Sequence, residues 1–352
     1  MHDHQRQWPR TSPLGEASQP RALDTALRAS VLACTLVAAA CTETLDAGSS
    51  RPHGPLPVDE RNPIVLLNDN YSENWQGEYA MLLANGGGPP LAGIIVCTSG
   101  PWPNIDANFA GWRNMVTAAR DGGLKKIPDP IKSAGAPLNR PASGVIEDTS
   151  PNGSDGALLI NDLSRQLSLP YRPLVVLTGG RLTDVADAYL NEHSVVDRVV
   201  VVAALGGASS DGGGTMGPPN GEMDTWADWI VTSRFRYVQV SAYYDQLTDV
   251  PSSRVPELPA NAFGQWIAAK QSSIWNDPLA ADQIAVMAVA IPEFATDVLR
   301  VAPIGPVTAG ASTGPTLAKV SGAPGWLVDQ GASAVAIERF WQILHDPGTF
   351  KP

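Results

Sequence analysis

Polar residues gather at five points where the sequence predicts that a strand ends. Their carboxylate, amide and hydroxyl groups can ligate a hard cation, bind sugar hydroxyls or take up a proton. In open parallel sheets, ligands bind outside the carboxyl ends of the strands, so these stretches are where chemistry is expected. The five stretches are residues 68–78, 98–108, 178–181, 206–224 and 276–278.

Alternating strands and helices must position these stretches. Short apolar runs bounded by Gly, Pro or polar residues predict buried strands, and amphipathic or Ala/Leu-rich stretches between them predict helices. A parallel sheet covered by helices on both faces follows from this alternation. We therefore expect a single α/β domain with a mostly parallel, Rossmann-like open sheet over residues 62–346. The expected strands are residues 63–67, 91–97, 174–177, 195–205 and 237–241, before a β-rich tail. The expected helices are residues 78–85, 106–120, 155–167, 183–191, 222–235, 261–275, 279–290 and 334–344.

Composition excludes several classes of protein. The 352 residues are 43% hydrophobic and 17% charged, which allows a sizeable core and argues against global disorder. The net charge of −11 disfavours a nucleic-acid-binding protein. No run of apolar residues is long enough for a multi-span membrane protein. Cys97, the one cysteine of the expected domain, lies in an apolar run and is predicted to be buried.

The N-terminal region is typical of an export signal. Residues 29–40 form an uncharged apolar run whose length suits a signal peptide rather than a membrane-spanning helix. Small residues directly before Cys41 resemble a bacterial lipobox, although Ala38 stands where Leu is usual. We expect residues 1–41 to be a signal peptide with lipid attached at Cys41, and residues 42–61 to be a Pro-rich tether. This predicts a membrane-anchored lipoprotein of the bacterial cell envelope, with a secreted form as the alternative.

Taken in order, the strand exits resemble the inosine/uridine-preferring nucleoside hydrolase family. In that family the first strand runs into a D-x-D-x-G-x-D-D cluster and a helix rich in Ala and Leu. The later T-G-G-L-T-N, E-F-N-x-W-x-D and H-D-P motifs also have similar counterparts here, in the same order. Each motif is weak alone, and the order carries the resemblance over residues 62–345. The counterparts in this chain are residues 68–84, 178–184, 222–228 and 276–278.

The resemblance implies hydrolysis of an N-glycosidic bond in a nucleoside or other ribosyl compound, through an oxocarbenium-like transition state. It also implies a Ca²⁺ ion that binds ribose hydroxyls and a water molecule. By analogy alone, the protein would be a homo-oligomer. The residues at the metal-ligand positions of the motifs are Asp69, Asn70, Thr178 (through its carbonyl group) and Asp277.

Other motif positions imply catalytic and substrate-binding roles. Glu222, Asp224 and Asn74 stand at positions that contact the substrate. Glu73 is the candidate base, and Asn276 stands where many members have a histidine that helps the base to leave. Asn cannot act as an acid, so the leaving group would need other help.

The aspartate cluster departs from the family pattern, and three alignments are open. Counted from the strand, Asn70 replaces the first metal-binding aspartate. Counted from the helix, Gln76 and the glycine after it replace the Asp-Asp pair. The third alignment starts at Asp69 and puts Glu73 and Asn74 on the acidic positions, and we favour it because it keeps a metal-binding carboxylate and a base.

These departures support a second function from another class. A catalytically inactive lipoprotein that binds a sugar or nucleoside would keep the pocket and could lose the acidic pair and the histidine. Asp277 is open to a second interpretation too, because Asp before Pro is also a helix-capping signature. Metal-dependent hydrolysis would separate the two functions.

Overall fold

The structure is a computed structural model, and it describes only part of the chain. The predicted signal peptide, Cys41 and residues 42–55 of the predicted tether lie outside the described residues. The described residues are 56–70, 76–99, 102–133, 136–204, 223–240, 260–274, 283–291, 297–303, 317–319, 325–329, 342–343 and 345–346.

The described residues form a nine-stranded sheet in the order β3-β2-β1-β4-β5-β6-β9-β7-β8. All neighbours from β3 to β9 pair in parallel, whereas β7 is antiparallel to both β8 and β9. The strands are β1 (Ile64–Asn68), β2 (Leu91–Val96), β3 (Pro130–Lys132), β4 (Leu174–Thr178), β5 (Val199–Ala204), β6 (Arg236–Val240), β7 (Asp297–Pro303), β8 (Leu317–Lys319) and β9 (Gly325–Asp329).

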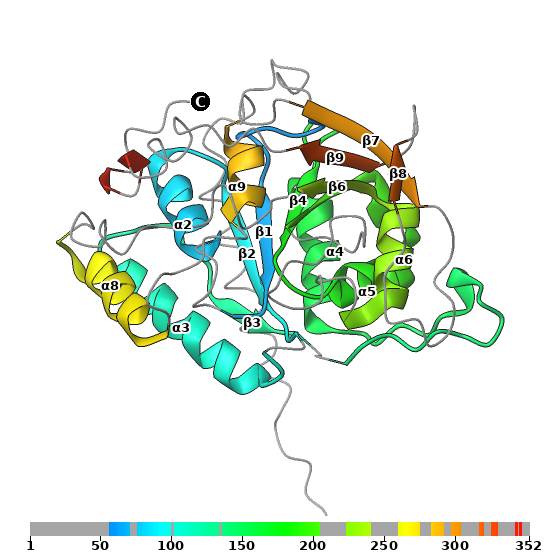
Figure 1. The fold of residues 1–352 in the computed structure, drawn as a ribbon, viewed down its shortest axis with the longest axis horizontal. Helices are drawn as coiled ribbons and strands as arrows, with labels where there is room; N and C mark the ends of the chain where they lie inside the picture. The colour runs from blue at the N-terminus through cyan, green and yellow to red at the C-terminus, as the bar shows by residue number, and fades with distance from the viewer. Residues whose placement is uncertain are drawn as a thin grey trace, which may run out of the picture. The chain divides into compact units, whose positions relative to one another are not determined.

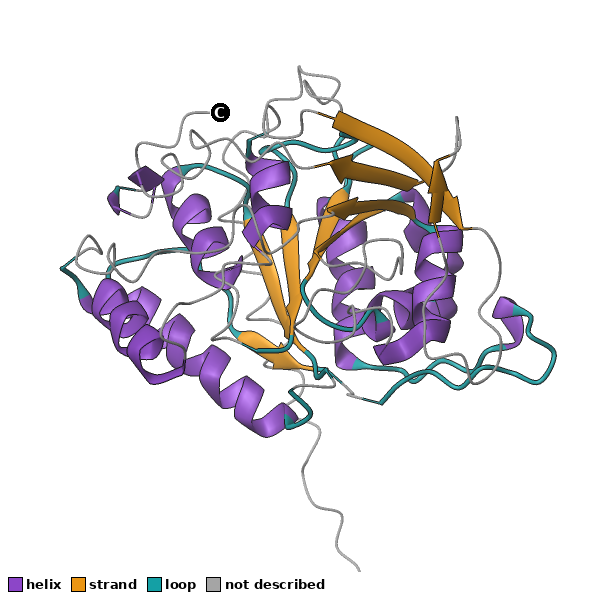
Figure 2. Cartoon of the chain, viewed as in Figure 1, coloured by secondary structure: helices purple, strands orange, loops and turns teal. Residues whose placement is uncertain are grey.

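Helices cover both faces of the sheet (Figure 1; Figure 2). Alternate residues of a strand point to opposite faces, so Ile64 and Leu66 of β1 join one apolar cluster while Val65 and Leu67 join the other. The first cluster includes α2, α3, α8 and α9, and the second includes α4, α5 and α6. The helices are α2 (Gln76–Gly86), α3 (Ile105–Asp121), α4 (Asp155–Leu167), α5 (Thr183–Asn191), α6 (Thr225–Arg234), α8 (Ala262–Ile274) and α9 (Gln283–Ala290).

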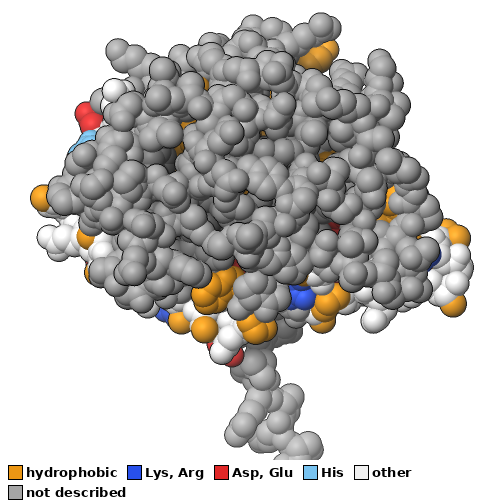
Figure 3. All heavy atoms as spheres, in the orientation of Figure 1, with side chains coloured by type: hydrophobic (Ala, Val, Ile, Leu, Met, Phe, Trp, Pro, Cys, Tyr) orange, Lys and Arg blue, Asp and Glu red, His pale blue; other side chains and the backbone are white. Residues whose placement is uncertain are grey.

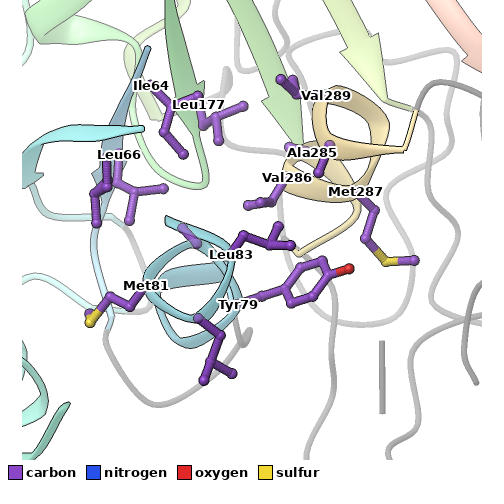
Figure 4. Close-up of a cluster of buried hydrophobic side chains, with 14 of the residues drawn as sticks. Ile64, Leu66, Tyr79, Met81, Leu83, Leu177, Ala285, Val286, Met287 and Val289 are labelled. Atoms are coloured by element: carbon purple, nitrogen blue, oxygen red, sulfur yellow. The ribbon is translucent and has the colours of Figure 1, made fainter. Parts of the chain in front are cut away.

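Helix α9 is buried where it packs on α2. Its residues from Ala285 onward are buried, in keeping with a sequence that is apolar on every side. Figure 4 shows Tyr79 and Leu83 of α2 pointing toward α9. This contact fixes α2 against the sheet, and α2 begins at the exit of β1.

The predicted α/β architecture is confirmed, with local corrections. Helix α6 begins at Thr225 rather than at residue 222, because Asp224 accepts a hydrogen bond from the Ala227 amide and caps the helix. Strand β3 was missed in a turn-rich segment because it has only three residues and starts with proline. The expected helix over residues 334–344 lies almost wholly outside the described residues.

The predicted tether extends too far into the domain. Leu56 and Val58 belong to the first apolar cluster, and Asp59 is buried beside them. Asn62 then donates a hydrogen bond to the carbonyl of Pro173, just before β4. The domain therefore begins at Leu56 or earlier, not at residue 62.

Few large apolar side chains of the described residues are exposed; they are Val145, Leu158, Leu169 and Tyr171. Along the lower edge of the face in Figure 3, hydrophobic side chains lie among polar and charged ones. Within the described ranges, no helix is long and apolar enough to cross a membrane.

Candidate functional site at the β1 and β4 exits

The strand order reverses between β1 and β4, because the chain first adds β2 and β3 on one side of β1 and then β4 to β6 on the other. Ligands of open α/β sheets bind at this reversal, outside the carboxyl ends of the strands. Asp69 and Asn70 follow β1 there, and Thr178 ends β4 opposite Leu67. The structure thus brings three of the predicted metal-site residues to one edge.

An amide pair connects the end of β1 to the start of α2. The Asn68 side-chain amide donates a 2.8 Å hydrogen bond to Oε1 of Gln76, and both residues are fully buried. This contact places Gln76 directly beside the strand exit. The contact does not decide among the three alignments, because residues 71–75 between the strand and the helix lie outside the described residues.

Gly180 allows the loop after β4 to pass close to the ends of β1 and β2. A Cβ atom at Gly180 would lie 2.4 Å from the Cys97 sulfur and 3.3 Å from the Asp69 backbone nitrogen. Any side chain here would push the loop away from the neighbouring exits. Cys97 is buried as predicted, and burial raises the pKa of its thiol well above the usual value.

Asp69 is a buried carboxyl group held by local donors. Its Oδ1 accepts a hydrogen bond from the Asn70 amide, and its carboxylate also forms a hydrogen bond with the Ser99 side chain. Trp112 of α3 donates from Nε1 to the Asp69 carbonyl at 3.3 Å. Burial raises the pKa of the Asp69 carboxyl, and the hydrogen bonds and the charge of Arg181 oppose that shift.

Arg181 places a cation inside this edge. Its side chain is only 7% exposed, Nε donates to the Thr98 carbonyl at 2.8 Å, and Nη2 donates to the Thr98 hydroxyl. Because Thr98 lies just beyond β2, the guanidinium connects the exits of β4 and β2. Arg181 stands between the Gly-Gly pair and the Leu-Thr of its motif.

Further aspartates lie at the starts of α5 and α6. Asp224 accepts from the Leu138 amide and the Thr183 hydroxyl, both at 2.8 Å, in addition to capping α6. Asp184 accepts from the Ser133 hydroxyl at 2.5 Å. Burial raises the pKa of both carboxyls above the usual value, and the charge of Arg181 opposes only part of that rise. Asp224 is thus positioned by protein contacts, and its predicted contact with substrate stays a prediction.

Asp228 is buried without a hydrogen-bond partner. It lies one helical turn after Asp224 on α6, is fully buried, and neither carboxylate oxygen has a partner. Burial and the neighbouring charge of Asp224 raise its pKa well above the usual value. A raised pKa means that folding favours the protonated form of Asp228 relative to the unfolded chain.

The other predicted site residues lie outside the described residues. They are the candidate base Glu73, the substrate contacts Asn74 and Glu222, the leaving-group residue Asn276 and the metal ligand Asp277. Their roles stay predictions.

Ca²⁺ takes six to eight oxygen ligands, often with several carboxylates among them, and the described residues include only three of the four predicted metal ligands. Asp69 is the single carboxylate among the described predicted ligands, and its oxygens already accept hydrogen bonds. Thr178 offers a buried hydroxyl without a partner. Among the described residues, no group of three or more His, Cys, Asp and Glu side chains could hold a metal ion.

A cavity of about 190 Å³ lies at the other ends of α2 and α3, not at the strand exits. Asn85 of α2, Phe263 of α8 and His345 are among its lining residues. Its volume is below the usual range for small-molecule sites.

Comparison with solved structures identifies the fold. No family model matches the sequence, and no curated protein is significantly similar to it. The purine-preferring ribonucleoside hydrolase from Gardnerella vaginalis superimposes with a TM-score of 0.55 at 14% identity, over 82% of this chain and 100% of that one. An inosine-guanosine nucleoside hydrolase gives 0.59 at 15% identity, over 82% and 99%. This chain has the nucleoside hydrolase fold.

A third structure with this fold is a nucleoside hydrolase-related hypothetical protein from Saccharophagus degradans, associated with carbohydrate metabolism. It gives a TM-score of 0.53 at 13% identity, over 83% of this chain and 72% of that one. The resemblance drawn from the ordered motifs is thus confirmed for the fold.

Sequence reasoning missed several residues that shape this edge of the nucleoside hydrolase fold. It gave no individual role to Arg181, Thr98, Ser99 or Asp184, and it did not foresee the contact between Asn68 and Gln76. Arg181 had one visible signal, since it is an added charge within the otherwise matching T-G-G and L-T motif. The other contacts join residues far apart in sequence, and no local pattern marks them.

Replacing Gly180 with alanine should destabilise the protein, because the new Cβ would overlap the Cys97 sulfur. We expect the free energy of unfolding to fall by about 1–3 kcal/mol, as is usual for overpacking. Cys97→Ala removes the sulfur, so the double variant should lose less than the sum of the two single variants. Urea unfolding of all four proteins measures this coupling. If the losses of the two single variants simply added in the double variant, the close approach of Gly180 to Cys97 would not constrain the loop after β4.

Asp228 should make stability fall as pH rises. Its pKa is raised on folding, so the folded state holds the proton more tightly than the unfolded chain, and stability declines from about pH 4 upward. Asp228→Asn cannot ionise and should gain about 1–3 kcal/mol over the wild type at pH 8, while differing little at pH 4.

Urea unfolding at pH 4 to 8 measures that difference. Asp162→Asn, at an exposed position of α4, is the matched control and should follow the wild type. If the free energy of unfolding changed with pH in the same way for Asp228→Asn and the wild type, the raised pKa of Asp228 would be contradicted.

Proposed function

We propose that this protein is an exported hydrolase that cleaves an N-glycosidic bond of a nucleoside or related ribosyl compound. The observation that carries the proposal is the position of Asp69 and Thr178 at the reversal of strand order, in a fold matched over 82% of this chain by nucleoside hydrolases. The reaction class rests on that likeness together with the acidic groups at the edge.

The chemistry needs negative charge near the sugar. As the bond between C1′ and the leaving nitrogen breaks, positive charge develops on the sugar ring, and a water oxygen then bonds to C1′. The water loses a proton to a base, and the departing nitrogen gains one. Carboxylates that are already fixed in place stabilise such a charge without reorganising. Asp69 is the described carboxylate at the reversal, and Glu73 is the proposed base.

A sugar- or nucleoside-binding lipoprotein without catalysis is the second candidate. The neutral Gln76 at an acidic position of the helix-counted motif favours it, because an amide does not take up a proton at neutral pH. In both proposals the protein is anchored to the cell-envelope membrane by lipid on Cys41, which the signal-like sequence before Cys41 supports. The ligand in both is a small molecule.

Hydrolysis of p-nitrophenyl β-ribofuranoside by the purified protein tests the proposal. This leaving group departs without an acid, so Asn276 should not prevent turnover. We expect Asp69→Asn to lower kcat/KM by about 10²-fold or more, because it removes the charge that faces the transition state. The exposed Asp162→Asn is the control and should keep full activity. Absence of turnover in the folded wild type would favour the binding protein.

A further inference from the structure

The chain enters the sheet at the edge opposite the candidate site. Because β1, β2 and β4 run parallel, the segments that lead into them lie at one edge of the sheet, the amino edge, and the strand exits lie at the other. The Asn62 side-chain amide donates to the Pro173 carbonyl at 2.7 Å. The Val175 backbone amide donates to the Pro63 carbonyl at 2.9 Å. The start of the domain is therefore fixed beside the segment that leads into β4.

A braced turn lies in that segment, and we call residues 168–173 the entry turn. The backbones of Leu169 and Arg172 exchange two hydrogen bonds, both of 2.9 Å, which close the turn tightly. The Ser168 hydroxyl fixes the base of the turn by donating to a backbone carbonyl at 2.8 Å and accepting from a backbone amide at 2.9 Å. These hydrogen bonds hold the tip of the turn in one position at the amino edge.

The tip of the entry turn is apolar and exposed. Leu169 is 46% exposed and Tyr171 is 64% exposed, and Pro170 between them is exposed as well. Leucine and tyrosine suit a membrane interface, because both offer apolar surface and the tyrosine hydroxyl stays in contact with water. Residues 168–173 contain no acidic side chain, and Arg172 carries their one charge. Anionic headgroups would therefore attract the turn rather than repel it.

The chain between the predicted lipid and the domain is short. Residues 42–55 separate Cys41 from Leu56, whose side chain is buried in the first apolar cluster. A segment of this length spans at most about 50 Å when fully extended. Lipid on Cys41 would thus keep the domain near the bilayer, at a local concentration that populates weak contacts. A small apolar tip that would bind a membrane weakly by itself is then sufficient to orient the tethered domain.

We propose that the entry turn rests on the membrane to which the protein is anchored, with Leu169 and Tyr171 between the headgroups. The proposal rests on the lipid anchor of the proposed function. Strand β1, five residues long, then separates the membrane side from the site edge by roughly 15 Å. Asp69 and Thr178 lie at the edge away from the bilayer. The site therefore takes a water-soluble ligand from the aqueous compartment rather than a headgroup of the supporting membrane.

Fluorescence quenching on vesicles tests this orientation. The lipidated protein, produced from the full chain, is placed in vesicles of phosphatidylethanolamine and phosphatidylglycerol with a fluorophore on Pro170→Cys. Cys97 is buried, Cys41 holds the lipid and Cys34 leaves with the predicted signal peptide, so the new thiol takes the label. We expect lipids with a nitroxide near the headgroup to lower the emission by about twofold, because interfacial apolar groups sit roughly 5–10 Å into the headgroup boundary.

Ala107→Cys is the matched control at the opposite edge. Ala107 is exposed in the first turn of α3, which follows the exit of β2, so the same fluorophore there should keep its emission. Replacing both Leu169 and Tyr171 with serine should remove most of the quenching at residue 170, while the lipid keeps the protein on the vesicles. Equal quenching of the two labels, or none at residue 170, would overturn the proposal.

The remaining outcomes separate this orientation from the proposed function. A protein that floats with the vesicles but is not quenched at residue 170 has the anchor and lacks the orientation. If the turn instead paired two copies of the protein, emission would change with protein density and not with nitroxide lipids, which also overturns the proposal. A wild type that does not associate with vesicles would overturn both the anchor and the orientation. Turnover of p-nitrophenyl β-ribofuranoside reports on hydrolysis independently of all these results.

Discussion

The cost of burying carboxylates is the constraint on which the candidate site depends. Asp69, Asp184, Asp224 and Asp228 are all at least 95% buried, and an isolated charge in such surroundings is strongly unfavourable. The chain meets this cost in two ways. Backbone amides and hydroxyls donate hydrogen bonds to the first three acids. Asp228 has no such partner, and burial raises the pKa of its carboxyl well above the usual value.

This arrangement also explains why loops far apart in sequence come together. Asp224 joins α6 to Leu138 and to Thr183 of α5, and Asp187 accepts from the amides of Asn152 and Ser154 before α4. The carboxylates therefore fix the loops around the strand exits as well as supplying charge. A substitution at one of these acids would move backbone, so loss of activity alone would not identify a catalytic residue.

The sequence was most informative where structure is local. The range predicted for α4 is the observed one, because Ser154 caps it and its apolar residues recur with helical spacing. Strands β1 and β4 were also found, since both are short apolar runs next to polar or glycine residues. The site was harder to predict. The Asn68–Gln76 contact depends on how α2 returns to β1, and the Arg181–Thr98 contact joins residues 83 positions apart. Such contacts arise from packing, and spacing along the chain does not encode them.

The balance of charge at the β1 and β4 exits bears on the choice between hydrolase and binding protein. Catalysis requires the edge to stabilise a sugar that is becoming positive more than it stabilises the bound substrate. A positive charge on Arg181 would work against that requirement if the guanidinium faced the sugar. The buried guanidinium of Arg181 donates two hydrogen bonds to Thr98, so it points toward the β2 exit. Among the described residues, that direction leaves the Asp69 carboxyl as the acidic group at the reversal, and the proposed hydrolysis depends on this group.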